Sequence, residues 1–295
     1  MGGKKNEKNR ENIMQSIITQ NLADIVEREK NKGRNPLYIR SALKEYLQVY
    51  MLNFIYTHKE YSKIFLFTGG TCLRHCFGLN RLSEDIDFDL TYNVNPQEIA
   101  RELVTYWKNR FGEENVLVSV RQRGKQILQR FSVLRELGLA TAQESPVLYV
   151  KTDLSPIQTK IYDTQTTLKH LYGFSYLVNH YDLPSLMAGK IHAVIFRQRF
   201  AGREDKEVVK GRDFFDLLWF LQNKVKLNLP RLQALMKRKV NESEVWDMVD
   251  ERVKWAMKLK DSFARDLLPF IENQEIVVGF VETYQKQYVT ARRGI

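Results

Sequence analysis

The feature that most constrains this chain is a pair of glycines between a short apolar run and a helix-like segment. Residues 64–67 are all apolar, which predicts a buried strand, and Gly69 and Gly70 follow almost at once. Residues 71–77 then have helical spacing. Glycines at such a turn let the backbone approach a phosphate group, and the free N–H groups of the helix start, with the Thr71 hydroxyl, can donate to it. The sequence therefore predicts an anion-binding turn.

A row of acidic residues follows about fifteen positions later. Residues 85–90 alternate acidic and apolar side chains, which predicts a strand with Asp85, Asp87 and Asp89 on one face. Two ionised carboxylates this close repel each other unless a cation lies between them, and Mg²⁺ prefers carboxylate oxygens completed by phosphates and water. We therefore predict a site for Mg²⁺, or Mn²⁺, at Asp85 and Asp87. Taken separately, the glycine pair is also typical of an ordinary turn, and Asp-x-Asp of an exposed polar face.

Hydrophobic periodicity divides the chain into parts of different kind. Residues 1–10 predict a disordered basic arm, residues 11–180 mix strand-like and helical segments, and residues 181–295 are nearly all helical in pattern. The predicted fold class is α/β, with a mixed sheet and flanking helices at 11–180 and an all-helical C-terminal domain at 181–295. Strands are expected at residues 64–67, 85–90, 116–120, 147–154 and 174–178. Helices are expected at residues 11–29, 37–56, 71–77, 96–111, 126–139, 184–200, 212–223, 229–240, 244–268 and 274–288.

The charge balance points to an anionic partner. The chain has a formal net charge of +11, which suits a nucleic acid or a nucleotide. Basic residues cluster at 121–125, between 197 and 212, and at 237–239. A solvated face is the default interpretation, but the second cluster could hold the phosphates of a folded RNA, and the third could extend it. Because no apolar stretch of about 18 residues and no secretory leader is evident, we expect no membrane span and a cytoplasmic location.

Three positions outside these motifs are candidate functional residues, each with an ordinary alternative. Asp153 is on a predicted strand that could neighbour the acidic strand and supply a third carboxylate to orient or deprotonate a hydroxyl, or it could cap a strand end. Lys190 borders the apolar face of a predicted helix, where its ammonium could reach a phosphate or extend to solvent. Asp213 begins a helix, a position that Asp favours in any protein.

Five segments together resemble the AbiEii/AbiGii toxin family of bacterial nucleotidyltransferases, known from abortive-infection and toxin–antitoxin systems. They are residues 67–74 (FTGGTCLR), 82–88 (LSEDIDF), 151–154 (KTDL), 183–193 (LPSLMAGKIHA) and 211–217 (GRDFFDL). The resemblance covers roughly residues 60–225 and implies a nucleotidyltransferase fold. The N-terminal arm and about the last 70 residues match nothing specific.

The resemblance also implies an activity, the transfer of a nucleoside monophosphate from an NTP with Mg²⁺. The implied metal ligands are Asp85, Asp87 and Asp153, and Asp153 also activates the acceptor hydroxyl. The implied cradle for the triphosphate is Gly69, Gly70, Thr71 and Arg74. Lys190 is expected to neutralise charge on the leaving pyrophosphate, and Asp213 to hold Lys190 or the nucleotide in place.

The implied acceptor is the 3′ end of tRNA, where added nucleotides would block aminoacylation and translation, and a cognate antitoxin is expected as partner. Two alternatives keep the fold: nucleotidylylation of a protein hydroxyl, similar to AMPylation, and a non-catalytic module that binds RNA or the antitoxin. A zinc site at Cys72, His75 and Cys76 is not expected, because three ligands on one short helix, with no second pair at suitable spacing, do not form a tetrahedral site.

Overall fold

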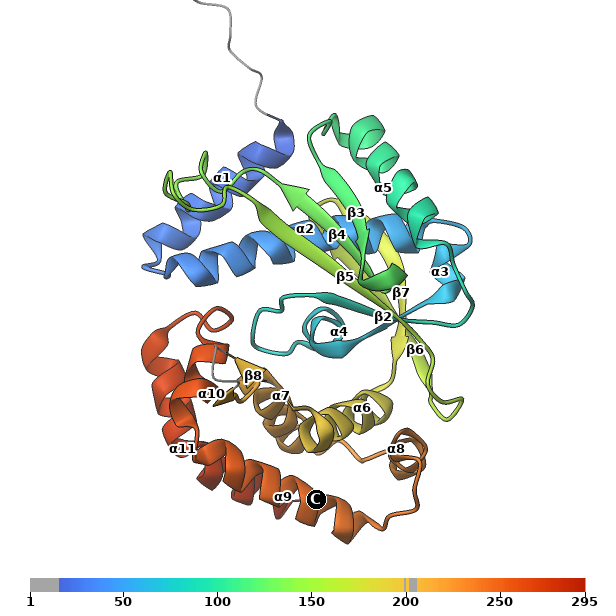
Figure 1. The fold of residues 1–295 in the computed structure, drawn as a ribbon, viewed down its shortest axis with the longest axis vertical. Helices are drawn as coiled ribbons and strands as arrows, with labels where there is room; N and C mark the ends of the chain where they lie inside the picture. The colour runs from blue at the N-terminus through green and yellow to red at the C-terminus, as the bar shows by residue number, and fades with distance from the viewer. Residues whose placement is uncertain (1–15, 199, 202–205, 295) are drawn as a thin grey trace, which may run out of the picture.

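The fold was analysed in a computed structural model that describes residues 16–198, 200–201 and 206–294 (Figure 1). The arm expected at residues 1–10 lies outside the described residues. A mixed sheet with helices around it forms one part of the molecule, and a group of helices forms the other, at the bottom of Figure 1. This arrangement confirms the predicted α/β fold class with a helical C-terminal region.

Seven strands of the described chain form one sheet in the order β3-β4-β5-β2-β1-β7-β6. Their bounds are β1 (Phe65–Thr68), β2 (Ile86–Leu90), β3 (Leu117–Arg121), β4 (Gln126–Phe131), β5 (Leu148–Pro156), β6 (Thr164–Leu171) and β7 (Phe174–Tyr181). The acidic strand β2 is central, antiparallel to β1 and parallel to β5. Because β2 is central, its apolar residues Ile86 and Phe88 are buried on one face while its acidic residues share the other.

Helices cover the sheet and continue beyond it. They are α1 (Ile17–Asn31), α2 (Pro36–Thr57), α3 (Tyr61–Ile64), α4 (Gly69–Phe77), α5 (Pro96–Phe111), α6 (Leu183–Phe196), α7 (Gly211–Gln222), α8 (Leu229–Met236), α9 (Glu242–Met257), α10 (Lys260–Leu267) and α11 (Gln274–Arg292). Most of α2 is buried because it packs on the sheet through β5 and β7 and is covered by α1. None of the described helices is long and apolar enough to cross a bilayer.

Asparagine, serine and aspartate begin many of these helices. Each accepts a hydrogen bond from a backbone N–H of the first turn, and the capping residues are Ser16, Asn35, Asn95, Asp182, Asn228, Asn241 and Asn273. A proline also follows the cap at the start of α2, α5, α6 and α8, where its missing N–H costs nothing. These local signals explain why most helix starts were predicted within a few residues.

The secondary structure differs from the prediction in several places. The helix expected at 126–139 is strand β4 followed by turns. The polar Gln129 occupies a buried position of this strand, where it accepts a hydrogen bond from Trp107 Nε1 at 2.8 Å. The alternation of apolar and polar residues that is typical of a strand is therefore not visible in the sequence. Strand β6 was not expected because it is a polar edge strand. The helix expected at 244–268 is interrupted after Met257, and a small ribbon, β8 (Phe200–Ala201) with β9 (Lys206–Glu207), lies between α6 and α7.

Candidate active site

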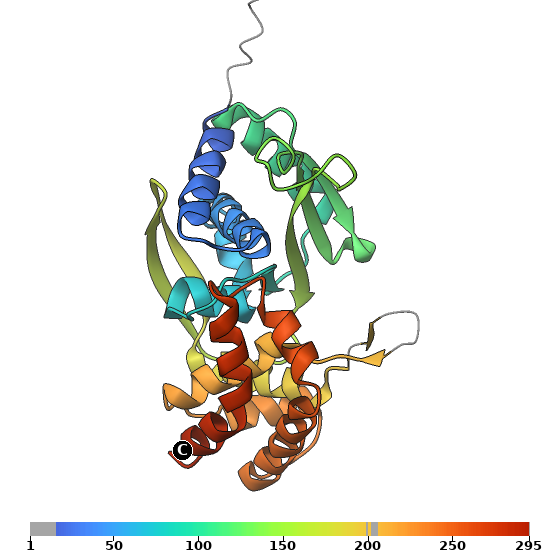
Figure 2. The ribbon, with the colours of Figure 1, turned by 90° about the vertical axis from the view of Figure 1, so that its left-hand side faces the viewer.

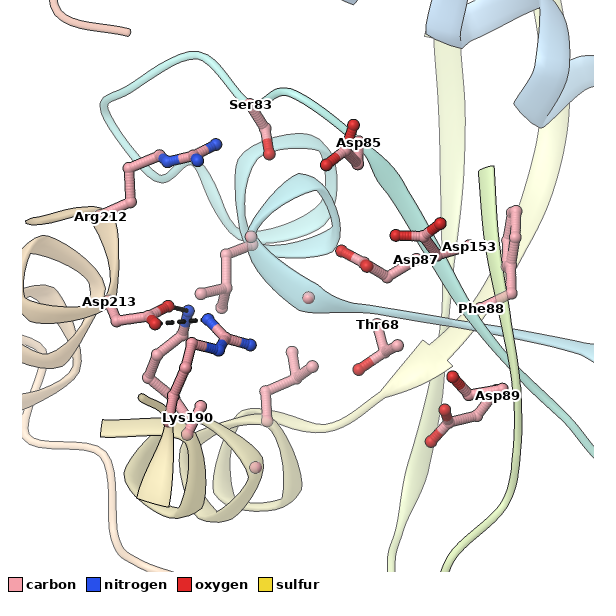
Figure 3. Close-up of a pocket in the computed structure, with 18 of the residues that line it drawn as sticks. Thr68, Ser83, Asp85, Asp87, Phe88, Asp89, Asp153, Lys190, Arg212 and Asp213 are labelled. Atoms are coloured by element: carbon pink, nitrogen blue, oxygen red, sulfur yellow. Dashed lines mark hydrogen bonds and ion pairs between the residues drawn. The ribbon is translucent and has the colours of Figure 1, made fainter. Parts of the chain in front are cut away.

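A cavity of about 330 Å³ lies between the acidic face of the sheet, the start of α4, and helices α6 and α7 (Figure 3). Its lining includes seven of the nine predicted site residues: Gly69, Gly70, Asp85, Asp87, Asp153, Lys190 and Asp213. Thr71 and Arg74, the other two, do not line it. Segments that are far apart in the sequence thus converge on one cavity.

The sheet topology places the three carboxylates together. Strand β2 pairs in parallel with β5, and Asp87 lies directly opposite Asp153. Burial raises the pKa of Asp87 to about 7, with further contributions from the nearby Asp153 and Asp85. Burial, followed by the charge of Glu84, also raises the pKa of Asp85, although Lys151 Nζ lies 3.8 Å from Asp85 Oδ1. The three carboxylates therefore repel one another in a site that is mostly buried.

This donor set fits a divalent metal ion. Hard cations such as Mg²⁺ take carboxylate oxygens as ligands, and Asp85 Oδ1 is buried without a hydrogen bond from any described residue. The Gln126 side-chain amide donates to Asp153 Oδ1 at 2.7 Å and so orients that carboxylate from the next strand. The arrangement provides carboxylate oxygens as ligands and carries an excess of negative charge, which a bound cation would neutralise.

The glycine turn packs closely against side chains from other parts of the fold. Gly69 has φ +77°, in the left-handed region, and a Cβ atom on it would overlap the carboxylate of Asp87. A Cβ on Gly70 would lie 2.5 Å from Arg81 Nη2. Glycine is therefore needed at both positions so that an acid of β2 and an arginine can pack against the start of α4.

We expect Gly69→Ala to destabilise the fold by about 2 kcal/mol, since it adds left-handed strain and a clash with a buried carboxylate. The free energy of unfolding in urea measures this change. Gly78→Ala is a matched control, because Gly78 also has positive φ, at +76°, but no described residue other than its chain neighbours has an atom within 4 Å of its Cβ position. Equal losses in the two variants would show that the packing against Asp87 has no energetic importance.

Thr71 and Arg74 do not line the cavity, and both side chains have partners elsewhere in the fold. Thr71 is fully buried, and its hydroxyl donates to the backbone carbonyl of Asp85 and lies 2.6 Å from Ser83 Oγ. Arg74 forms hydrogen bonds to both carboxylate oxygens of Glu45 on α2, at 3.0 and 3.2 Å. Thr71 thus anchors the loop before β2, and Arg74 joins α4 to α2.

The helices contribute a basic side to the cavity. Lys190 Nζ on α6 lies 2.8 Å from both Asp213 Oδ1 and Asp216 Oδ2 on α7. Arg197 binds the second oxygen of Asp213 at 2.5 Å. Burial opposes the ionisation of Asp213, but Lys190, Arg197 and other cations outweigh it and hold the pKa of this carboxyl well below its ordinary value. The predicted contact between Lys190 and Asp213 is therefore present.

Two further basic residues lie on this side: Arg81, which was not predicted, and Lys210, which was predicted only as part of the basic cluster between residues 197 and 212. Arg81 binds Asp216 through two hydrogen bonds of 2.7 Å, and its side chain is only 3% exposed. Lys210 lines the cavity just before α7. Burial lowers the pKa of Lys210, and no hydrogen bond or ion pair joins its ammonium to any other described residue. Its place next to the 211–217 motif was the signal that could have identified it.

A further acidic residue lies at the far end of the carboxylate row. Asp89 accepts a hydrogen bond of 2.6 Å from Tyr181, and the Arg231 guanidinium packs over the Tyr181 ring at 4.4 Å. Asp89 and Arg231 both line the cavity. Burial raises the pKa of Asp89, against the effects of Tyr181 and Arg231.

The two cysteines lie near a histidine, but not the one considered from the sequence. Ligand atoms of Cys72, Cys76 and His180 lie within 4.8 Å of one another. Both ring nitrogens of His180 already have partners, the Thr167 hydroxyl and the Tyr181 carbonyl, each at 2.8 Å. Burial also raises the pKa of the Cys72 thiol, which opposes the thiolate that a metal needs. These groups pack as part of the core.

His75 gives the fold a sensitivity to acid. Burial, together with Lys169 and Arg74, lowers the pKa of His75 from 6.5 to about 3. The unfolded chain therefore binds a proton between these values that the folded chain does not, so stability falls as the pH drops from about 6.5 toward 3. When the pH is lowered from 6.5 to 5, the free energy of unfolding should fall in the wild type. We expect this fall to be smaller by about 2 kcal/mol in His75→Phe, which has no imidazole to protonate. The free energy of unfolding in urea is measured for both proteins at the two pH values. An equal loss in His75→Phe and in the wild type would contradict this prediction.

A glycine turn at a helix start, next to clustered carboxylates on the following strands, is typical of enzymes that act on phosphate groups through a metal ion. A family model described as nucleotidyl transferase AbiEii toxin, type IV TA system, matches residues 53–281. The chain therefore belongs to this family of nucleotidyl transferase toxins of type IV toxin–antitoxin systems, as the sequence motifs predicted.

Solved structures include similar chains. JHP933 from Helicobacter pylori is 16% identical with a TM-score of 0.42, and the match covers 86% of this chain and 94% of that one. An antigenic nucleotidyltransferase-like protein from Paracoccidioides brasiliensis is 13% identical with a TM-score of 0.35, covering 84% and 93%. A search of curated proteins finds no match.

Proposed function

We propose that this protein transfers a nucleoside monophosphate from an NTP to the 3′ end of tRNA, with Mg²⁺ bound by Asp85, Asp87 and Asp153. The observation that carries the proposal is the opposition of charges within one cavity: three carboxylates on the sheet face basic residues on the helices. A nucleotide with its metal matches this pattern, since the ion suits the acidic side and the β- and γ-phosphates suit the basic side.

The reaction forms a bond between the acceptor hydroxyl oxygen and the α-phosphorus, and it breaks the bond to pyrophosphate. Asp153 is the proposed base that takes the hydroxyl proton, and the hydrogen bond from Gln126 fixes its orientation. A bound divalent ion would stabilise negative charge on the transferred phosphoryl group. The free N–H groups of Gly69 and Gly70 at the start of α4 are the proposed donors to the triphosphate.

The basic side is the proposed site of pyrophosphate. Lys190 is held between Asp213 and Asp216, so its position is fixed before the substrate arrives. Lys210 has no counter-ion in direct contact among the described residues, and a phosphate would supply one. Together with Arg197, these ammonium and guanidinium groups would balance the charge that develops on the leaving group.

We expect Lys210→Met to lower kcat/KM for the NTP about 10- to 100-fold, the effect of losing one hydrogen bond to a charged group. Steady-state transfer assays with varied NTP measure this effect. Lys226→Met serves as control, because Lys226 is an exposed lysine that does not line the cavity. Unchanged kcat/KM in Lys210→Met would remove this lysine from the proposed site.

The transfer assay tests the function. The protein is incubated with each α-labelled NTP in turn, Mg²⁺ and deacylated total tRNA, and the products are separated as RNA and protein. We expect label in RNA, lost on adding EDTA and lost in Asp153→Asn. Label in protein bands alone would favour nucleotidylylation of a protein hydroxyl, and no label in RNA would contradict the proposed acceptor.

The toxin–antitoxin family implies a cognate antitoxin, and we propose that it protects cells from this activity. Expression of the wild-type chain alone should then arrest growth, while the Asp85→Ala/Asp87→Ala variant should not. Undiminished toxicity of that double variant would instead favour a non-catalytic module that binds RNA or the antitoxin.

A further inference from the structure

We propose that the tip of the β3–β4 hairpin, residues 121–125, binds the phosphate backbone of the acceptor RNA. This inference rests on the proposed function and locates the side from which the acceptor approaches. The tip contains the short turn η1 (Gln122–Gly124) and carries three basic side chains, Arg121, Arg123 and Lys125. None of these residues lines the cavity itself.

The backbone connects this tip directly to the third carboxylate. Strand β4 pairs with β5 so that Gln126 lies opposite Asp153, and the Gln126 side chain donates to Asp153 Oδ1. The Leu154 N–H donates to the Lys125 carbonyl at 2.8 Å. The last residue of the tip, Lys125, is therefore next in sequence to the residue that pairs with the proposed base, Asp153. An RNA held on the tip would have its terminus near the carboxylate that must take its proton.

The charges of the tip are available for a ligand. The side chains of Arg121, Arg123 and Lys125 are exposed, and none of these three side chains forms a hydrogen bond or ion pair with another described residue. The neighbouring Lys151 differs, since it lies 3.8 Å from Asp85. Three uncompensated cations on one short turn raise the local concentration of a polyanion and can each displace a counterion from a phosphate.

The backbone of the tip also departs from what ordinary side chains prefer. Gln122 has φ 51° and Arg123 has φ 56°, two successive residues in the left-handed region without being glycine. A Cβ on the next residue, Gly124, would lie 3.5 Å from Pro96 at the start of α5, in ordinary contact. Positive φ values are usual at the turn of a β-hairpin, and here the turn presents basic side chains to solvent.

The position of the tip suits an extended ligand. Figure 2 shows the β3–β4 tip and the β8–β9 ribbon projecting from the same side of the molecule, with the tip on the sheet and the ribbon on the helical region. The cavity lies between the sheet and those helices. An RNA terminus could enter between the two projections while the tip holds the backbone behind it. A phosphodiester chain fits this arrangement, because recognition by position and charge needs no base-specific contact.

The test compares tRNA binding by the wild type and by Arg121→Ala/Arg123→Asn/Lys125→Ala. Asparagine is chosen at 123 because it tolerates the left-handed conformation. Binding of labelled deacylated total tRNA is measured at several KCl concentrations. For three lost contacts with single-stranded RNA, we expect the slope of log K against log [KCl] to become shallower by about 2, and affinity at 0.1 M KCl to fall at least about tenfold.

A charge-matched control separates a local effect from net charge. Lys226→Ala/Lys258→Ala/Lys286→Ala removes the same charge from exposed positions of the helical region. We expect tRNA affinity close to that of the wild type for this control, and unchanged NTP affinity in both triple variants. Thermal unfolding confirms that the tip variant remains folded.

The outcomes distinguish this inference from the proposed function. Equal weakening in both triple variants, or no weakening in the tip variant, overturns the role of the tip even if the wild type labels tRNA. If tip-dependent tRNA binding is found but RNA is not labelled, the binding surface stands and the proposed transfer fails. If the wild type does not bind tRNA, the inference is overturned, and label found only in protein would then point to a protein acceptor.

Discussion

Replacing Asp87 with asparagine should abolish nucleotide transfer while making the metal-free protein harder to unfold. Asp87 lies between Asp85 and Asp153 and against the glycine turn, so it is the central ligand of the proposed metal site. Loss of a metal-holding carboxylate removes several kcal/mol of transition-state stabilisation, which corresponds to a rate lower by about a thousandfold or more. The transfer assay with labelled NTP measures this loss.

The gain in stability follows from the pKa of Asp87, which burial and the two neighbouring acids raise from 3.8 to about 7. The folded state holds this proton more tightly than the unfolded state, so in the wild type stability is lost as the pH rises from about 4 to about 7. The asparagine side chain of the Asp87→Asn variant has no such proton to lose. We expect the advantage of this variant in unfolding free energy to be small at pH 4 and on the order of 3 kcal/mol at pH 8 in EDTA.

Mg²⁺ gives the matching control for this prediction. Added at pH 8, it should raise the melting temperature of the wild type, because binding to the folded state alone stabilises it. Asp87→Asn should gain much less. Equal stability of the two proteins at pH 8 in EDTA would contradict the proposed repulsion, and full activity of the variant would contradict the metal site.

The site was predictable where chemistry and chain order agree. Gly69 and Gly70 follow an apolar strand pattern, whereas the acids of β2 and Asp153 lie within strand patterns, so the elements that carry them could be located from the sequence. That Asp153 lies opposite Asp87 depends on strand order, which periodicity does not encode. The family motifs supplied this step, together with the pairing of Lys190 with Asp213.

The remainder depends on tertiary contacts that leave no local pattern. The family resemblance implied that Arg74 binds the triphosphate, yet its guanidinium binds Glu45 on α2. Arg81 is in a loop with no distinctive spacing, and only the fold brings it to Asp216, which is 135 residues later. A buried polar side chain such as Gln129 likewise obscures the alternation of a strand until its partner is known.

Replacing Asp216 with asparagine should cause the largest loss of stability among these variants. Asp216 is completely buried and compensates both Arg81 and Lys190. Its pKa is lowered because these two cations outweigh the effect of burial. Asparagine has nearly the same shape but no charge, so it leaves a buried guanidinium without its counter-ion. We expect a loss of about 3–5 kcal/mol in the free energy of unfolding, measured in urea at pH 7.

The double variant Arg81→Met/Asp216→Leu separates the energy of the pair from the cost of isolating one charge. Replacing both partners of a buried ion pair with apolar groups is often close to neutral, so the double variant should be more stable than Asp216→Asn. Lys190 still has Asp213 in this background. Strictly additive losses in Arg81→Met, Asp216→Leu and the double variant would show that the two side chains are not coupled. Because Arg81 packs against Gly70, we also expect the double variant to lose transfer activity even where it remains folded.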